Sequence, residues 1–157
     1  MGLNYTTYFL HGFVSGTFNY FIILQKESLQ TGSPLISKLV RVYHTDRSTL
    51  SYSEIPIQCY DSEGNLHKHV QAAYVTRLGS ELAAELGIGV HDDVLFATFT
   101  SSDSPGSVIC RYTLEEINSN IAQRNKECTV KRPLENVDNS KNGIRCPAIE
   151  IPVSKIA

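Results

Sequence analysis

Apolar and polar residues alternate over short runs in the first third of the chain, and this period of two predicts β-strands. The predicted strands cover Phe9 to Val14, Thr17 to Gln25, Ile36 to Tyr43 and Ser51 to Cys59. Ser15-Gly16 forms a turn between the first two strands, and polar segments separate the others. Four consecutive strands with short links predict a four-stranded antiparallel meander.

The second predicted strand is apolar on both faces, which indicates that both faces are covered. Its side chains divide into one face with Phe18, Tyr20, Ile22 and Leu24 and another with Phe21 and Ile23. Pro56 cannot donate a hydrogen bond to a neighbouring strand, so the fourth strand is expected at a sheet edge. One such sheet cannot cover both of its own faces, and a blade of a β-propeller solves this by stacking on its neighbours.

The second half of the chain mixes strands with two short helices. Strands are predicted over His69 to Val75, Asp93 to Thr100 and Ser107 to Thr113. The first helix is predicted over Ser80 to Leu86, with Ser80 as its N-cap and Gly87 as its C-terminal stop.

The second helix is predicted over Leu114 to Lys126. Thr113 and Glu116 have the spacing of a capping box, in which each side chain bonds the other residue's free amide. An apolar stripe follows at helical spacing, formed by Leu114, Ile117 and Ile121. The segment from Thr129 to Ala157 is polar with three prolines, so a loop is expected there and no outer strand for the second sheet.

Composition and charge exclude several classes of protein. The 157 residues suit about one domain, 41% are hydrophobic, and the net charge is −2. No cluster of Lys and Arg forms a stripe, so nucleic acid is not expected as a partner. The longest apolar stretch, Phe18 to Leu24, is too short to span a bilayer, and the first ten residues lack the features of a signal peptide.

The four cysteines are Cys59, Cys110, Cys128 and Cys146. No Cys-x-x-Cys pair occurs, which argues against a zinc site. An even number fits two disulfides in an oxidising compartment, but four reduced thiols in a cytosolic protein fit the spacing as well. Asn4-Tyr5-Thr6 is a sequon for N-glycosylation. Extracellular features without a secretion signal are explained most simply if the chain is a fragment.

Catalytic and cofactor motifs are weak throughout, so no enzyme, metal or cofactor is expected. Gly87-Ile88-Gly89 lacks the third glycine of a dinucleotide fingerprint, and no nucleophile elbow is present. His91-Asp92-Asp93 is expected to be a turn, and His67 and His69 are expected to be solvated. Met1-Gly2 with Thr6 matches a myristoylation pattern, which conflicts with disulfides and is set aside.

Several blocks of the sequence, in the family's order, resemble the sema domain of plexins, the receptors of semaphorins. The most specific block runs from Ser51 to Cys59. The further blocks begin at His11 (HGFVSG with YF and Q), Ser37 (SKLVR), Val70 (VQAAY), Asp92 (DDVLF) and Leu114 (with EIN and Cys128). Plexins usually have a cysteine where this chain has Tyr43.

The resemblance implies an all-β fold: part of a seven-bladed sema β-propeller, about two blades, with two short inserted helices. Residues 9–59 would form one four-stranded blade, residues 69–128 most of the next with helical insertions, and residues 129–157 a loop region. The resemblance also implies two disulfides, Cys59 with Cys110 and Cys128 with Cys146. Asn4 would be glycosylated in the secretory pathway.

The implied function is that of an extracellular, ligand-binding segment of a plexin-like receptor in semaphorin signalling, which guides cells and axons. A semaphorin is the expected partner, receptor homodimers are possible, and any membrane span lies outside this chain. A sema domain like that of the hepatocyte growth factor receptor is an alternative, as is a secreted semaphorin or adhesion propeller. The exposed loops His44 to Thr49 and Asp61 to His67 are the candidates for recognition.

Overall fold

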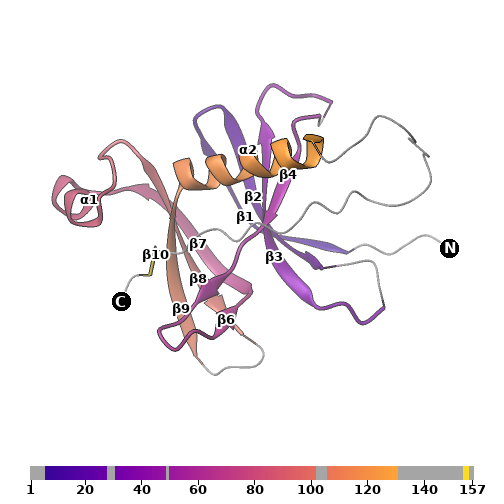
Figure 1. The fold of residues 1–157 in the computed structure, drawn as a ribbon, viewed down its shortest axis with the longest axis horizontal. Helices are drawn as coiled ribbons and strands as arrows, with labels where there is room; N and C mark the ends of the chain where they lie inside the picture. The colour runs from indigo at the N-terminus through magenta and orange to yellow at the C-terminus, as the bar shows by residue number, and fades with distance from the viewer. Residues whose placement is uncertain (1–5, 28–30, 49, 102–105, 131–153, 156–157) are drawn as a thin grey trace.

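The computed structural model describes residues 6–27, 31–48, 50–101, 106–130 and 154–155. Two four-stranded antiparallel sheets and two helices make up most of this part of the chain (Figure 1).

The first sheet is a meander in the order β1-β2-β3-β4. Its strands are β1 (Thr7–Ser15), β2 (Phe18–Lys26), β3 (Leu35–Tyr43) and β4 (Ser53–Pro56). Alternation of side chains places Tyr20 and Ile22 of β2 on the same face, and Ile22 pairs with Leu39 of β3. Leu39 in turn pairs with Ile55 of β4, so one buried row crosses three strands.

The second sheet has the order β10-β9-β8-β7. Its strands are β7 (His69–Arg77), β8 (Asp93–Thr100), β9 (Ser107–Thr113) and β10 (Ser154–Lys155). Its buried side chains, which include Leu95 of β8 and Tyr112 of β9, join those of the first sheet in one core. β7 contacts β1, β2 and β3, so it is the strand along which the second sheet meets the first.

Helix α2 (Leu114–Val130) continues directly from β9 and contacts β4, β8 and β9, which places it across the two sheets (Figure 1). The predicted capping box is confirmed, since Glu116 N donates to Thr113 Oγ1 at 3.1 Å and Thr113 N donates to Glu116 Oε2 at 3.0 Å. Leu114, Ile117 and Ile121 are buried in the common core, as their spacing predicts. The helix extends four residues past the predicted end at Lys126.

Helix α1 (Ser80–Leu86) lies between β7 and β8 and packs on a second, smaller core formed around Leu78, Ala83 and Val94. The predicted N-cap at Ser80 is wrong: Gly79 is the N-cap, its backbone is extended, and no side chain caps the helix. Gly79 O accepts the first helical hydrogen bond, from Ala83 N, so Ser80 is already inside the helix. Gly87 ends the helix as predicted, in the left-handed conformation that glycine adopts at low cost.

The predicted strand from Ser51 to Cys59 is divided in two. β4 ends at Pro56 on the sheet edge, as the proline indicates, and the chain then turns into β5 (Cys59–Tyr60). β5 pairs with β6 (Leu66–His67) in a small hairpin that the sequence pattern did not predict. The break occurs because Ile57 N bonds Ser37 O and Gln58 O accepts from Tyr112, so these two residues bond to different strands.

The end of the chain also differs from expectation. Residues 129–157 were expected to contain no strand, but Ser154–Lys155 pairs with Arg111 and Cys110 of β9. Two residues are too few for a periodic signal, so the sequence pattern could not predict this strand. β10 gives the second sheet a fourth, outer strand.

Candidate protein-recognition surface and the junction between the sheets

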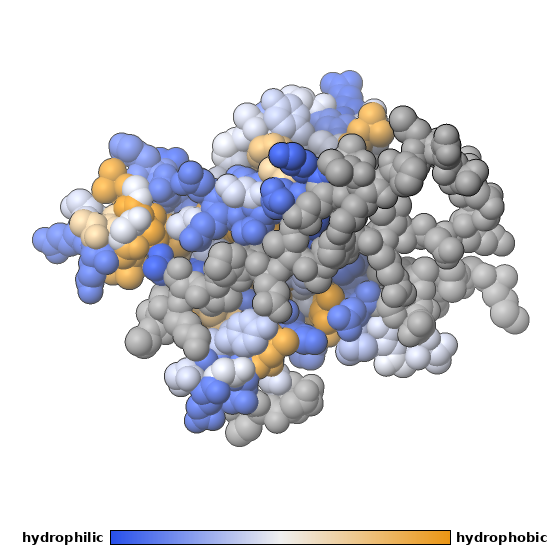
Figure 2. Space-filling view, viewed as in Figure 1, coloured by the Kyte–Doolittle hydropathy of each residue, from blue (hydrophilic) through white to orange (hydrophobic). Residues whose placement is uncertain are grey.

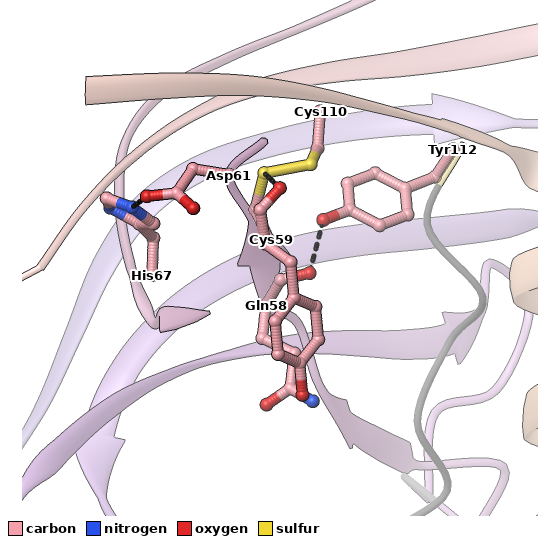
Figure 3. Close-up of a disulfide and its surroundings, with 7 residues drawn as sticks. Gln58, Cys59, Asp61, His67, Cys110 and Tyr112 are labelled. Carbon is pink, nitrogen blue, oxygen red and sulfur yellow. Dashed lines mark hydrogen bonds and ion pairs between the residues drawn. A yellow bond between two sulfur atoms is a disulfide. The ribbon is translucent and has the colours of Figure 1, made fainter. Parts of the chain in front are cut away.

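The disulfide between Cys59 and Cys110 joins the β5–β6 hairpin to β9 (Figure 3). The two Cα atoms are 6.0 Å apart, and both cysteines are fully buried. These are the same cysteines that the plexin resemblance pairs. Beside the disulfide, the Tyr112 hydroxyl donates to Gln58 O at 2.7 Å, and burial raises the pKa of this hydroxyl. A covalent bond and a hydrogen bond therefore join the segment that follows β4 to β9 of the second sheet.

Asn118 of α2 forms a second link between the sheets. Its Oδ1 accepts hydrogen bonds from the Tyr20 hydroxyl and from Arg41 Nη1, both at 2.8 Å. Burial raises the pKa of Tyr20, against the lowering effect of its bond to Asn118, and burial lowers the pKa of Arg41. The guanidinium also lies over the Phe18 ring, 4.3 Å from its centroid. Two side chains of the first sheet thus share one acceptor on the helix.

The end of α2 and the start of β8 add further polar links to the first sheet. Arg124 Nη1 donates to Glu54 O at 2.8 Å. Asp93 Oδ2 accepts from Ser15 Oγ at 2.6 Å, and Asp93 Oδ1 accepts from Arg77 Nε at 3.0 Å. The bonds of Ser15 to Asp93 and of Arg124 to Glu54 thus join the first sheet to β8 and to α2.

A buried ionic cluster lies on the other face of the first sheet, away from the core. Lys38 Nζ donates to Glu54 Oε1 at 2.7 Å and to Gln25 Oε1 at 2.9 Å. Burial opposes ionisation of Glu54, but the hydrogen bonds from Lys38 and Tyr52 outweigh it and lower the pKa. Lys38 interrupts the apolar pattern of β3 for this reason: its charge has two partners on neighbouring strands.

The histidines that were expected to be solvated are bound into the structure. His67 is only 2% exposed, and its Nε2 lies 3.1 Å from Asp61 Oδ2 (Figure 3). His69 Nε2 lies 2.8 Å from Leu35 O. The expectation failed because the unpredicted hairpin places His67 opposite Cys59, in the protein interior.

Asp61 organises the turn of this hairpin. Its carboxylate accepts from Glu63 N at 2.9 Å and from Asn65 N at 2.8 Å. The side chains of Asn65 and His67 bond it as well, and these bonds hold the pKa of Asp61 well below its usual range. The carboxylate is a structural group that fixes the loop.

The motifs that resemble chemical sites have structural roles. Asp92 accepts from Gly89 N at 2.9 Å in the turn before β8, so the expected turn includes His91 and Asp92, while Asp93 is the first residue of the strand. Within the described ranges, no three His, Cys, Asp or Glu side chains are grouped to hold a metal ion. Those ranges also contain no helix that is long and apolar enough to cross a membrane.

Exposed large apolar side chains form two separate sets on the first sheet. One set lies on β1, where Phe9 is 72% exposed and Tyr8, Leu10 and Val14 are also exposed. The other set lies at the turn between β3 and β4 and comprises Tyr43, Leu50 and Tyr52. A smaller set lies at α1, where Figure 2 shows hydrophobic residues gathered at the left end of the molecule.

Three of the predicted site residues cannot be placed. Asn4 and Cys146 lie outside the described residues, and Cys128 lies in α2 without a described side chain. Their roles remain predictions. The sequence pattern did not show the structural roles of three residues. Asn118 bonds residues that are distant in the sequence, Asp61 bonds backbone amides of its own turn, and His67 bonds the Asp61 side chain.

The family model of the Sema domain matches residues 70–148, and the chain belongs to this family. The relatives that match the sequence include plexins. Plexin-A4 of Danio rerio is 37% identical over 142 residues, which is 80% of this chain and 7% of that protein. Plexin-A3 of Homo sapiens is 35% identical over 133 residues, or 77% of this chain and 7% of that protein. The predicted resemblance to plexins is confirmed.

Solved structures agree with the sequence relatives. The extracellular region of plexin A4 matches with a TM-score of 0.73 at 29% identity, over 94% of this chain and 18% of that one. Drosophila plexin A shares the fold, with a TM-score of 0.51 at 18% identity over 72% of this chain and 23% of that one. The fold is that of a sema propeller domain, and the chain spans only 7% of the length of the plexins it matches.

Proposed function

We propose that this chain is part of the extracellular sema propeller of a plexin-like receptor, on the outer side of the plasma membrane. Residues 9–59 would form one blade and residues 69–128 most of the next, to which β10 adds an outer strand. Two sheets that share one core and are joined by a disulfide support this division. Further blades would cover the exposed side chains of β1, such as Phe9.

The function that we propose is recognition of a semaphorin, in signalling that guides cells and axons. The observation that carries it is identity of 34–37% to plexins over 77–80% of the chain. Drosophila plexin A has been solved in complex with semaphorin 1b, which identifies the class of ligand to test. Recognition through surface contact needs no catalytic group, and it suits the exposed aromatic side chains of the first sheet.

The test is binding of the complete ectodomain to a panel of semaphorins from the same organism, measured by surface plasmon resonance. We expect saturable binding to at least one semaphorin. Binding to a hepatocyte-type growth factor and to no semaphorin would favour the related growth factor receptor. Binding to neither class would favour a secreted or adhesion propeller and would contradict the proposal.

A further inference from the structure

The two sheets repeat the same row of residue types across their four strands. In the first sheet, paired positions run through two aromatic residues, an arginine and a serine: Phe13, Tyr20, Arg41 and Ser53. In the second sheet, paired positions run through the same types in the same order: Tyr74, Phe96, Arg111 and Ser154. The two aromatic residues and the arginine of each row are therefore neighbours on one face of their sheet.

A shift of register in the first strand of each sheet supports this alignment. The pairing resumes at His11 in β1 and at Ala72 in β7. The first aromatic residue of each row, Phe13 or Tyr74, comes two positions after that point. The rows therefore occupy equivalent places in the two sheets, and the contacts of the first row indicate what the second row requires.

The row of the first sheet is covered by the second sheet and by α2. The rings of Phe13 and Tyr20 stack with centroids 4.9 Å apart, and both residues pack in the core that the two sheets share. Asn118 on α2 accepts hydrogen bonds from Tyr20 and Arg41. Because α2 follows β9 directly, the acceptor for this arginine comes from the part of the chain that forms the next sheet.

The row of the second sheet lies on the face that is turned away from this core. Phe96 lies between two core residues of β8 and therefore points to the other face. Tyr74 is 66% exposed on that face, and Ile109, two positions before Arg111, is 50% exposed. Within the described part of the chain, these two apolar side chains remain uncovered.

Arg111 indicates that this face is incomplete. Its Nε is shielded from solvent, and no residue that the structure describes bonds its guanidinium. Shielded charges in proteins are stable when they are paired. In the first row one amide oxygen serves both Tyr20 and Arg41, whereas Phe96 has no hydroxyl that could share an acceptor. A carboxylate is the acceptor that suits a guanidinium alone, because its charge is opposite.

The existing contact between the two sheets identifies what covers this face. A propeller repeats one interface from blade to blade, and one copy of it lies between the two sheets of this chain. The chain superposes on the plexin A4 extracellular region with a TM-score of 0.73 and covers only 18% of it. In a propeller of this kind the repeat continues past the second sheet.

We infer that the face with Tyr74, Phe96, Ile109 and Arg111 binds the following blade of the same propeller, and that this blade provides an acidic side chain for Arg111. The inference rests on the proposed place of this chain within a sema propeller. Arg111 is then the counterpart of Arg41, whose acceptor lies across the first interface.

The first test measures whether the face is covered in the complete ectodomain. Hydroxyl-radical footprinting compares oxidation of Tyr20, Tyr52 and Tyr74 in the native and the unfolded protein. Tyr20 is fully buried in this chain, whereas Tyr52 is 48% exposed. We expect Tyr74 to be protected as strongly as Tyr20, while Tyr52 reacts readily. Oxidation of native Tyr74 at a rate close to that in the unfolded protein would overturn the inference.

The second test replaces Arg111 with methionine in the same ectodomain, with Arg47→Met at an exposed position as the matched control. Both changes remove one positive charge and keep an unbranched side chain. We expect Arg111→Met to lower the melting temperature by about 4 °C or more, because it leaves a buried carboxylate of the following blade unpaired. Arg47→Met should change it by less than about 1 °C, as exposed positions do. Equal melting temperatures of the two variants would contradict the pairing.

The third test identifies the partner of Arg111. Arg111→Lys keeps the positive charge and introduces an amine, which a zero-length carbodiimide links to a carboxylate in contact with it. Mass spectrometry of the digested protein gives the position of the linked residue. We expect an aspartate or glutamate in the blade that follows β10. A link elsewhere in the ectodomain, a link between two molecules, or no link in the folded variant would show that the proposed partner is wrong.

These outcomes are separate from those of ligand binding. If no semaphorin binds but Tyr74 and Arg111 behave as expected, the contact between blades stands and the proposed recognition fails. If a semaphorin binds and Tyr74 is oxidised freely, the contact is wrong although the proposed recognition stands.

Discussion

The Tyr20 hydroxyl of β2 donates to Asn118 Oδ1 of α2 at 2.8 Å, across 98 positions of the sequence. Arg41 donates to the same oxygen, so a single side chain on the helix satisfies two polar groups of the first sheet. Tyr20 is fully buried, so its hydroxyl depends on partners within the protein. Asn118 is therefore one of the contacts that hold α2 against the first sheet, together with its buried apolar stripe and Arg124.

Replacing Asn118 with alanine should destabilise the ectodomain by about 1–3 kcal/mol, because a buried donor is left without its acceptor. Ser119→Ala is the matched control, since Ser119 is exposed in the same turn of helix, and its effect should be within about 0.5 kcal/mol. Chemical denaturation of both variants measures the difference.

The double variant Tyr20→Phe with Asn118→Ala should lose less stability than the sum of the two single variants, because both single changes remove the same hydrogen bond. Strict additivity would show that the bond contributes nothing.

Removal of the Cys59–Cys110 disulfide should cost about 4 kcal/mol in the chain-entropy model, because the bond closes a loop with a sequence separation of 51. The double variant Cys59→Ala with Cys110→Ala should lower the melting temperature of the ectodomain under non-reducing conditions. Reductant should lower the melting temperature of the unaltered protein in the same direction. A double variant that melts like the unaltered protein would mean that the bond does not constrain the propeller.

Peptide mapping without reductant should recover two linked pairs, Cys59 with Cys110 and Cys128 with Cys146, from protein secreted by eukaryotic cells. The first pair is present in the structure, and the second is implied by the plexin resemblance. The same digest should show Asn4 carrying a glycan. Four free thiols would contradict both pairs and the extracellular location.

The hairpin turn should respond to acid through Asp61. Its pKa in the folded state is lowered by bonds from Asn65 and His67, so the unfolded state binds the proton more readily. The stability that Asp61 contributes is therefore present above its unfolded pKa, about 4, and is lost as pH falls toward the lower folded value. Asp61→Asn should flatten the acid side of the stability curve, whereas Glu81→Gln on α1 should not. If the stability of Asp61→Asn fell with decreasing pH just as that of the unaltered protein does, the bonds of Asp61 would not contribute to stability.

Local chemistry in the sequence predicted some elements well and others poorly. Thr113 and Glu116 identify the start of α2 because both partners of the capping box lie within four residues. Gly87 ends α1 for a similar local reason. The β5–β6 hairpin was missed because its turn depends on the Asp61 carboxylate reaching backbone amides, which leaves no periodic pattern. Periodicity alone predicted a four-stranded sheet like a propeller blade. The resemblance to sema domains predicted the propeller fold.

The recognition surface was predictable only in part, because exposure depends on contacts between distant residues. The loop His44 to Thr49 was identified as a candidate because exposed loops carry recognition. That Leu50 stands exposed while Phe18 is half covered follows from the Asp46 and Ser51 hydrogen bonds and from packing across β3. The charged cluster at Lys38 shows the same limit: its partners Gln25 and Glu54 lie on two other strands. Sequence distance therefore hides the interactions that shape both faces of the sheet.

The 157-residue chain on its own should be a poor folding unit if it is part of a larger propeller, as proposed. β1 is paired on one side only, and its exposed Phe9 and Val14 lie on the face that a neighbouring blade would cover. Unpaired strand edges and exposed apolar surface promote aggregation. The disulfide lowers the entropy of the unfolded chain but adds no buried area.

We therefore expect the isolated chain to aggregate or to unfold without a cooperative transition, while the complete propeller melts sharply. Calorimetry and size-exclusion chromatography of both proteins measure the difference. Phe9→Ser with Val14→Ser should make the isolated chain more soluble, because it removes exposed apolar surface. In the complete propeller the same pair should be destabilising, because both side chains would be buried there. A compact, monomeric chain of 157 residues with a sharp transition would rule out the proposed place of these two sheets within a ring of blades.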